Sequence, residues 1–136
     1  MKGVKFFFLI GFLFFFSSEI TAQATSPVTF SEIMFRPQET NGEFVELYNT
    51  SATETIDIAN YKFKYYTSSN NNLATVSGGT LLGPGKFAVI IQGNYDWTNG
   101  IYKNLIPAGT VVMKTSGNNF GSSGMANETS REVYLI

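Results

Sequence analysis

The sequence predicts an all-β fold, a β-sandwich or barrel, behind an N-terminal targeting segment. Three observations support this prediction. After residue 25, six to eight short runs of apolar and aromatic residues follow strand-like patterns. Turn signals rich in Gly, Pro and Asn separate these runs, and no stretch keeps a helical period. The first 24 residues have a different composition from the rest and read as a processing signal.

Residues 1–24 have the three parts of a secretory signal peptide. Their first five residues include two lysines, residues 6–16 are apolar except for one glycine, and a short small-residue part follows. Because Ala22-Gln23-Ala24 fits the rule for cleavage, we expect cleavage after Ala24 and a domain over residues 25–136. The apolar part is shorter than the about 20 residues of a membrane helix, which disfavours the alternative of an uncleaved anchor. We therefore expect a secreted, periplasmic or cell-surface protein that is free of the membrane after cleavage.

The composition excludes several classes of function. The 136 residues include no cysteine and no histidine, so the chain has neither a disulfide framework nor a Ser-His or Cys-His catalytic pair. Removal of residues 1–24 takes away two lysines and one glutamate and leaves seven basic and nine acidic side chains. A net negative domain is a poor binder of nucleic acid, which rewards clustered Lys and Arg. We expect no nucleic-acid partner.

The first two predicted strands are residues 28–35 and 43–49. A turn over residues 36–42 joins them, because Pro37 removes a ladder donor and Asn41-Gly42 favours positive φ. Strict alternation in the first strand places Val28, Phe30, Glu32 and Met34 on one face. In the second strand, the same rule places Val45 and Leu47 opposite Phe44, Glu46 and Tyr48.

The middle of the chain predicts a broken strand and then a polar tip. Residues 55–66 alternate with period two, but the phase changes near Ala59-Asn60, which indicates a bend between two strand halves. Residues 67–72 read TSSNNN, and we expect a mobile tip there. A short strand-like run follows at residues 73–76.

The most apolar strand comes after the turn Gly83-Pro84-Gly85. Residues 86–91 are nearly continuously apolar, which predicts a central strand that is buried on both faces. Residues 92–100 form a loop, and residues 101–106 are compatible with strand or loop. Further strands are expected at residues 110–114 and 131–136, separated by a loop rich in Gly, Ser and Asn. Because the last residue falls inside a strand, we expect the natural domain to continue beyond Ile136.

Four blocks, in this order, resemble the lamin tail domain found in many exported bacterial proteins. They are FSEIMFRP (30–37), GEFVELYNTS (42–51), IDIANYKF (56–63) and GTLLGPGKFAVII (79–91). The closing residues 122–136 look like the family's Asn- and Gly-containing loop and last strand, so the resemblance covers about residues 28–136. The family usually has Trp where this chain has Tyr61. The resemblance implies an immunoglobulin-like antiparallel β-sandwich with no catalytic activity of its own.

Carboxylates are the first class of candidate site residue. Glu32, Glu43 and Glu46 lie on neighbouring predicted strands, and paired carboxylates can bind a metal or perform acid–base chemistry. The favoured interpretation is structural, because nothing else in the chain completes a catalytic set. Asp57 and Asp96 fit polar turns better than a calcium loop. The sequence predicts no catalytic residue, no metal site and no cofactor, although metal binding by the three glutamates stays open.

Aromatic residues are the second class. Tyr66, Tyr95, Trp97 and Tyr102 lie in or near predicted loops, where recognition residues collect, and are candidate contacts for a ligand or partner. Packing inside the loops or the core is the alternative role for each of them. A sugar-binding module should place Trp97 with Tyr95 or Tyr66 on one flat exposed face, whereas a scaffold should bury them.

Two functions follow as hypotheses. The first is a non-catalytic exported module with a structural or protein-interaction role at the cell surface or in the periplasm. The second is a carbohydrate-binding accessory module of an exported hydrolase. The expected partner is accordingly a protein or a surface polysaccharide. An enzyme is disfavoured, since no nucleophile–base pair is present.

Overall fold

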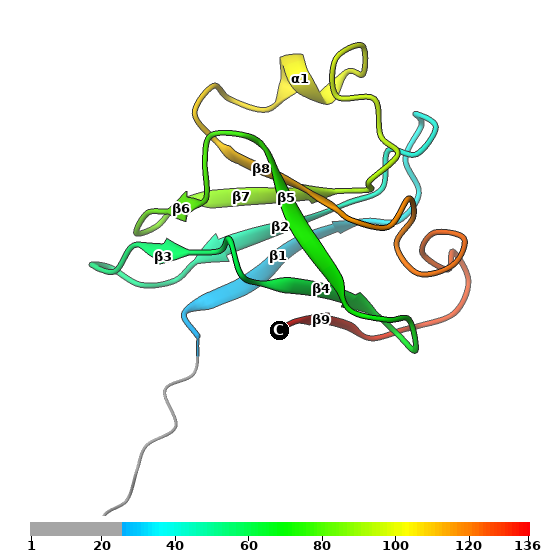
Figure 1. The fold of residues 1–136 in the computed structure, drawn as a ribbon, viewed down its shortest axis with the longest axis horizontal. Helices are drawn as coiled ribbons and strands as arrows, with labels where there is room; N and C mark the ends of the chain where they lie inside the picture. Colours follow the sequence, from blue (N-terminus) through cyan, green and yellow to red (C-terminus); the bar gives the residue numbers. More distant parts are fainter. Residues whose placement is uncertain (1–25) are drawn as a thin grey trace, which may run out of the picture.

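The computed structural model describes residues 26–136, and the predicted signal peptide with its predicted cleavage after Ala24 lies outside this range. The described part is nearly all β-structure, with a single helical turn (Figure 1). No helix within it is long and apolar enough to cross a membrane. The elements are β1 (Val28–Met34), β2 (Phe44–Asn49), β3 (Ile56–Asp57), β4 (Lys62–Tyr65), β5 (Asn71–Ser77), β6 (Leu81–Leu82), β7 (Phe87–Ile91), α1 (Tyr102–Leu105), β8 (Val111–Thr115) and β9 (Val133–Leu135).

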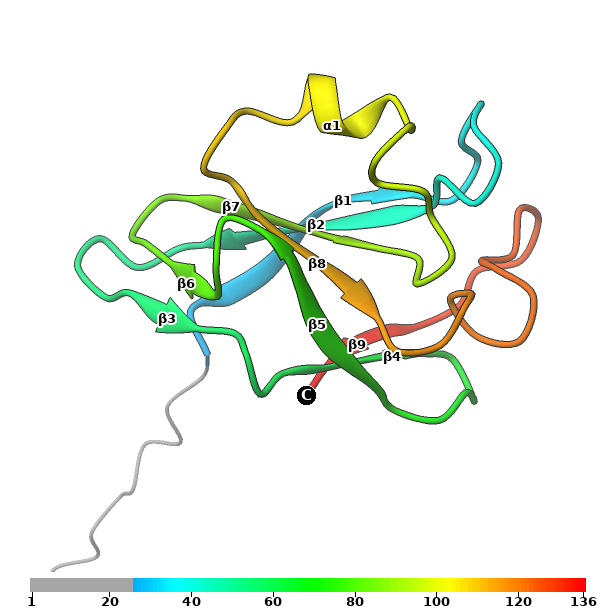
Figure 2. The ribbon, with the colours of Figure 1, turned by 45° about the horizontal axis from the view of Figure 1, so that its top comes forward.

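Seven strands form one curled sheet in the order β1-β2-β7-β8-β5-β4-β9, and β3 pairs with β6 in a small second sheet (Figures 1 and 2). All pairings are antiparallel except that of β7 with β8, which is parallel, so the prediction of a purely antiparallel fold is wrong at this position. The reason is the connection: residues 92–110 cross over one face of the sheet and return the chain in the same direction. A parallel pair needs such a crossover of a dozen or more residues.

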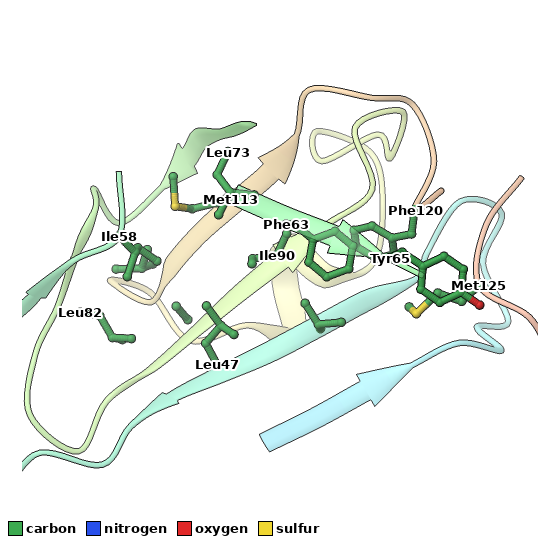
Figure 3. Packing of buried hydrophobic residues seen from close by; sticks show 13 residues of the cluster. Leu47, Ile58, Phe63, Tyr65, Leu73, Leu82, Ile90, Met113, Phe120 and Met125 are labelled. Atoms are coloured by element: carbon green, nitrogen blue, oxygen red, sulfur yellow. The ribbon is translucent and has the colours of Figure 1, made fainter. Parts of the chain in front are cut away.

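The main core lies on the concave face of the curled sheet. Strands β2 and β7 contribute Val45, Leu47, Ala88 and Ile90 to this core. These side chains pack with those of β4, β5 and β8, namely Phe63, Tyr65, Leu73 and Met113 (Figure 3). Phe120 and Met125, from the loop before β9, close one end, and Phe120 packs against Phe63 with ring centroids 4.5 Å apart. The alternation predicted for β2 is confirmed, since Val45, Leu47 and Asn49 are buried in turn.

Strand β7 has the predicted central position, between β2 and β8. Ala88 and Ile90 belong to the main core, whereas Val89 and Ile91 point to the opposite face and join a second apolar cluster. Burial on both faces explains why this segment carries no polar alternation. The strand therefore separates the main core from the region that residues 92–110 cover.

Strand β1 departs from strict alternation. The register with β2 shifts between Phe30 and Glu32, so a bulge at Ser31 interrupts the pairing. Phe30 lies opposite the buried Leu47, but Glu32 lies opposite Glu46. The predicted common face of Val28, Phe30, Glu32 and Met34 is wrong, because one extra residue turns every later side chain to the other side of the sheet.

The break predicted near Ala59-Asn60 is confirmed. β3 and β4 lie on either side of a turn and belong to different sheets. The following strand begins earlier than predicted, at Asn71, because the Gly117 N–H donates to Asn71 Oδ1 (3.0 Å) and the Ser116 N–H donates to the Asn72 carbonyl (2.9 Å). Residues 101–106 are neither strand nor simple loop, since four of them form α1. The last predicted strand is present as β9, paired with β4.

Candidate functional site

The convex face of β2, β7 and β8 carries a second apolar cluster. Val89, Ile91 and Val112 supply its floor, and the crossover segment 92–110 covers part of it. Three predicted contact residues of this segment, Tyr95, Trp97 and Tyr102, pack into the cluster. Tyr95 is only 6% exposed and the other two are half-buried. The crossover is thus held down by its own aromatic side chains.

Tyr95 and Tyr102 form the centre of this attachment. Their rings stack with centroids 5.0 Å apart, and the Tyr102 N–H donates to the Tyr95 hydroxyl oxygen at 3.1 Å. The Tyr95 hydroxyl donates to Glu39 Oε2 (2.7 Å), and the Tyr102 hydroxyl donates to the Gly42 carbonyl (2.7 Å). Burial, reinforced by the Glu39 carboxylate, raises the pKa of Tyr95 to about 12, so its phenol stays a hydrogen-bond donor at neutral pH. Nothing in the sequence pattern had singled out Glu39.

An apolar groove with a volume of about 710 Å³ lies where the crossover meets the turn between β6 and β7. Its walls include three strongly exposed apolar side chains: Leu81 (62% exposed), Phe87 (46%) and Leu105 (68%). Glu46 and Lys86 also line it. Of the four aromatic candidates, Tyr102 alone borders this groove, and Leu81 and Leu105 were not predicted as site residues.

The three glutamates do not converge. Glu32 and Glu46 lie opposite each other in the β1–β2 register, and Ser31 Oγ donates to Glu46 Oε1 at 2.8 Å. The Glu43 carboxylate accepts the Met125 N–H (2.9 Å) and the Gln92 side-chain amide (2.6 Å). Across residues 26–136, no group of three or more His, Cys, Asp or Glu side chains is placed to hold a metal ion.

Glu43 joins three separate segments instead. It precedes β2, Gln92 follows β7, and Met125 lies in the loop before β9. Partial burial raises the pKa of Glu43, and the Met125 N–H opposes this shift. Gln92 is buried, and its Oε1 atom has no hydrogen-bond partner among residues 26–136.

The two aspartates, Asp57 and Asp96, lie at polar turns, as expected, and their carboxylates accept nearby backbone N–H groups. Asp57 Oδ1 accepts the Ala59 N–H at 3.0 Å, and Asp96 Oδ1 accepts the N–H groups of Thr98 and Asn99 at 3.0 and 3.2 Å. Hydrogen bonds to these carboxylates, from the Ala59 N–H and the Asn99 side chain above all, lower the pKa of Asp57 and of Asp96. Both groups are occupied by their own loops.

The fourth aromatic candidate, Tyr66, lies in a different place. It follows β4, is 43% exposed, and is not part of the cluster around Tyr95. The Arg131 guanidinium carbon lies 4.4 Å from the centroid of its ring. A pocket of about 410 Å³ adjoins this pair. The four aromatics predicted as contacts therefore divide between a packed cluster and one exposed ring.

The comparisons with known proteins give one result for the chain. The family model of the lamin tail domain matches residues 21–136, which confirms the resemblance read from the four sequence blocks. No curated protein and no solved structure gives a significant match. With the strands, their curled sheet and the family match in agreement, the chain belongs to the lamin tail domain family and folds as an immunoglobulin-like module.

Proposed function

We propose that this protein is an exported, non-catalytic module that binds a protein partner through the apolar groove beside α1. The observation that carries the proposal is the exposure of Leu81, Phe87 and Leu105 along one groove. Large apolar side chains that gather on a surface, rather than being scattered singly, mark interaction sites. The signal-peptide pattern of residues 1–24 supports export.

The groove is held in shape before any partner arrives. The Phe87 ring packs on Tyr48 with centroids 4.7 Å apart, and the Phe44 ring meets Tyr102 edge-on at 5.4 Å. The Ile106 N–H donates to the Tyr102 carbonyl at 2.9 Å and ends the helical turn that carries Leu105. A rigid wall loses little conformational entropy on binding, which favours a stable complex.

The chemistry of the groove defines its partner. An apolar centre beside the charged side chains of Glu46 and Lys86 fits a protein segment that presents two or more apolar side chains and has a polar flank. Acid–base chemistry finds little support here, since the chain has no histidine and no cysteine and its aspartates close local turns. Membership of the lamin tail domain family, a family of non-catalytic modules, also supports a binding role.

A photo-crosslinking amino acid at position 105 tests the proposal in the cells that make the protein. Ile101 offers a matched control, because it is exposed to 50% and apolar but does not line the groove. We expect position 105 to give a discrete crosslinked protein and position 101 to give none.

The partner found in this way is then purified and its affinity measured. We expect Leu105→Lys and Leu81→Lys each to weaken binding at least ten-fold, and Ile101→Lys to change it less than two-fold. Equal crosslinking at positions 105 and 101 would reject the groove as the binding surface. The same holds if all three lysine variants bind the partner as tightly as the parent protein does. Thermal unfolding of each variant establishes that it is folded.

A further inference from the structure

A second, polar pocket lies away from the groove, between the turn after β4 and the loop before β9. It has a volume of about 410 Å³. Its lining is rich in hydroxyl groups, from Thr67, Ser68, Ser122 and Ser123. Arg131 is the one charged side chain among its lining residues in the described part of the chain. The pocket thus combines one cation with several neutral hydrogen-bonding groups.

Arg131 is held by an aromatic face. Its guanidinium carbon lies 4.4 Å from the centroid of the Tyr66 ring, within the range of a cation–π contact. The Tyr66 N–H donates to the Glu132 carbonyl at 2.8 Å, so the backbone beside Arg131 is tied to the tyrosine. A guanidinium that lies over a ring keeps N–H groups at its edge, and these suit a carboxylate or a sulfate.

The backbone of Tyr66 has an unusual conformation. Its φ is +50°, and among residues 26–136 it shares a positive φ with only one other non-glycine residue, Asn41. Asparagine adopts this region readily, but for a bulky ring it is uncommon. The surrounding hydrogen bonds enforce the conformation and leave the ring 43% exposed. Strained residues of this kind collect at ligand sites.

On the opposite side of the pocket, Gly121 and Gly124 let the loop before β9 approach the side chains of Tyr65 and Glu43 closely. A Cβ on Gly121 (φ +72°) would lie 2.9 Å from the Tyr65 ring, and one on Gly124 (φ +95°) would lie 2.9 Å from Glu43 Oε1. The Ala126 N–H donates to the Tyr65 hydroxyl oxygen at 2.7 Å and fixes the end of this loop. Ser122 and Ser123, between the two glycines, are exposed and line the pocket.

Two acidic groups of the adjoining segments, those of Glu43 and Glu132, are engaged with other partners. The Glu43 carboxylate, behind Gly124, accepts the Met125 N–H and the Gln92 side-chain amide. The Glu132 carboxylate accepts a hydrogen bond from the Tyr134 hydroxyl. Neither of these glutamates lines the pocket. Glu128 and Arg131 both line a neighbouring recess, but Glu128 does not line this pocket. Among the described residues, no acidic side chain lines the pocket, so the positive charge of Arg131 there faces an external anion.

We propose that this pocket binds a sugar that carries a carboxylate or sulfate group, as a unit of an acidic polysaccharide. The edge of the Arg131 guanidinium takes the acidic group through paired hydrogen bonds. The hydroxyls of Thr67, Ser122 and Ser123 match the hydroxyl groups of the sugar, and the exposed part of the Tyr66 ring contacts its C–H face. The proposal does not depend on the groove, which neither Tyr66 nor Arg131 lines.

Titration calorimetry on the protein, purified as its host exports it, tests this site with four probes. They are an oligogalacturonate, a sulfated dextran oligomer, a neutral dextran oligomer and an acidic peptide of equal charge. We expect binding of the oligogalacturonate, of the sulfated dextran oligomer, or of both. Comparison of these two titrations shows whether the pocket prefers a carboxylate or a sulfate group. Binding of the neutral sugar at equal strength, tighter binding of the peptide, or no sugar binding at millimolar concentration would overturn the proposal.

Matched variants assign the binding to the pocket. We expect Arg131→Gln to weaken acidic-sugar binding at least ten-fold, whereas Arg36→Gln, at an exposed arginine outside the pocket, changes it less than two-fold. Tyr66→Asn suits the positive φ and should leave thermal stability unchanged or raised while it weakens binding at least three-fold. Equal losses in the two arginine variants would show a general charge effect and reject the site.

Discussion

Asn49 shows how one buried polar residue organises several segments. Its side-chain nitrogen lies 2.7, 3.0 and 3.1 Å from the carbonyl oxygens of Glu54, Leu82 and Gly83, and its Oδ1 accepts the Ser51 N–H. The residue is fully buried at the end of β2. The sequence placed Asn49 at the end of a strand, but two of its three carbonyl partners, Leu82 and Gly83, belong to a segment more than thirty residues away.

Replacement of Asn49 should therefore be costly. We expect Asn49→Ala to lower the free energy of unfolding by about 2–3 kcal/mol, because buried carbonyl groups lose their donors. Urea denaturation measures this change. Asn104→Ala, at an exposed position on α1, serves as the control and should stay within about 0.5 kcal/mol. Equal effects of the two substitutions would contradict the role assigned to Asn49.

Glu43 gives a dependence of stability on pH. Because burial raises its pKa above 4.5 in the folded state, the folded protein binds the proton more tightly than the unfolded chain. The contribution of this group is complete below pH 4.5 and is lost as the pH rises through the raised pKa. Asp57 and Asp96 have lowered pKa values and act in the opposite direction at lower pH.

Glu43→Gln isolates this effect. The amide still accepts the Met125 N–H, and its own N–H can reach the unpartnered Oε1 of Gln92 after a rotation of that side chain. We expect the variant to be at least as stable as the parent protein at pH 7, by up to about 1 kcal/mol. The difference should shrink as the pH falls toward 4.5. Unfolding curves across this pH range test it, with Glu54→Gln, at an exposed carboxylate, as the control.

At the scale of elements, sequence patterns located most strands but not their partners. β2 and β7 were predictable because burial on one face gives an alternating apolar pattern and burial on both faces gives a continuous apolar run. Parallel and antiparallel strands share a period of two, so the β7–β8 pairing left no such trace. The bulge at Ser31 depends on the partner strand, and α1 is too short for a helical period.

The candidate site was predictable only in part, for a related reason. Aromatics in a loop suggest recognition, but the crossover folds back on the sheet and buries Tyr95. Glu39 and Arg131 act through contacts with residues 56 and 65 positions away, respectively, which no local pattern reveals. The exposure of Tyr66 was predictable because an aromatic beside a polar tip is a local signal, while its role as a contact stays a prediction.

The attachment of the crossover can be tested at Tyr95. We expect Tyr95→Phe to lower the free energy of unfolding by about 1–2 kcal/mol, since the Glu39 carboxylate and the Tyr102 N–H both lose their partner. Tyr61→Phe is the matched control, because its hydroxyl makes an exposed contact with Ser26 and should matter by less than about 0.5 kcal/mol. Guanidinium titration compares the two, and similar losses would mean that the buried network adds little.

At the scale of the whole molecule, the two faces of the sheet are used differently. The concave face holds the main core, whereas the convex face binds the crossover and leaves the apolar groove at its margin. The polar pocket draws instead on the loops around β4 and β9. In the described part of the chain, no residue lines both recesses. A variant in one recess should consequently leave the binding measured at the other unchanged.

The strand order also governs how the chain reaches this structure. Within the large sheet, β1–β2, β4–β5 and β7–β8 join strands that follow each other in the chain, whereas the pairings of β2 with β7, β5 with β8 and β4 with β9 join strands that are farther apart in the sequence. Such distant pairings make the folding of β-proteins slow, in the range of milliseconds to seconds. For a chain that is exported as we propose, this delay keeps the polypeptide extended and threadable while it crosses the membrane, and the finished sheet assembles on the far side.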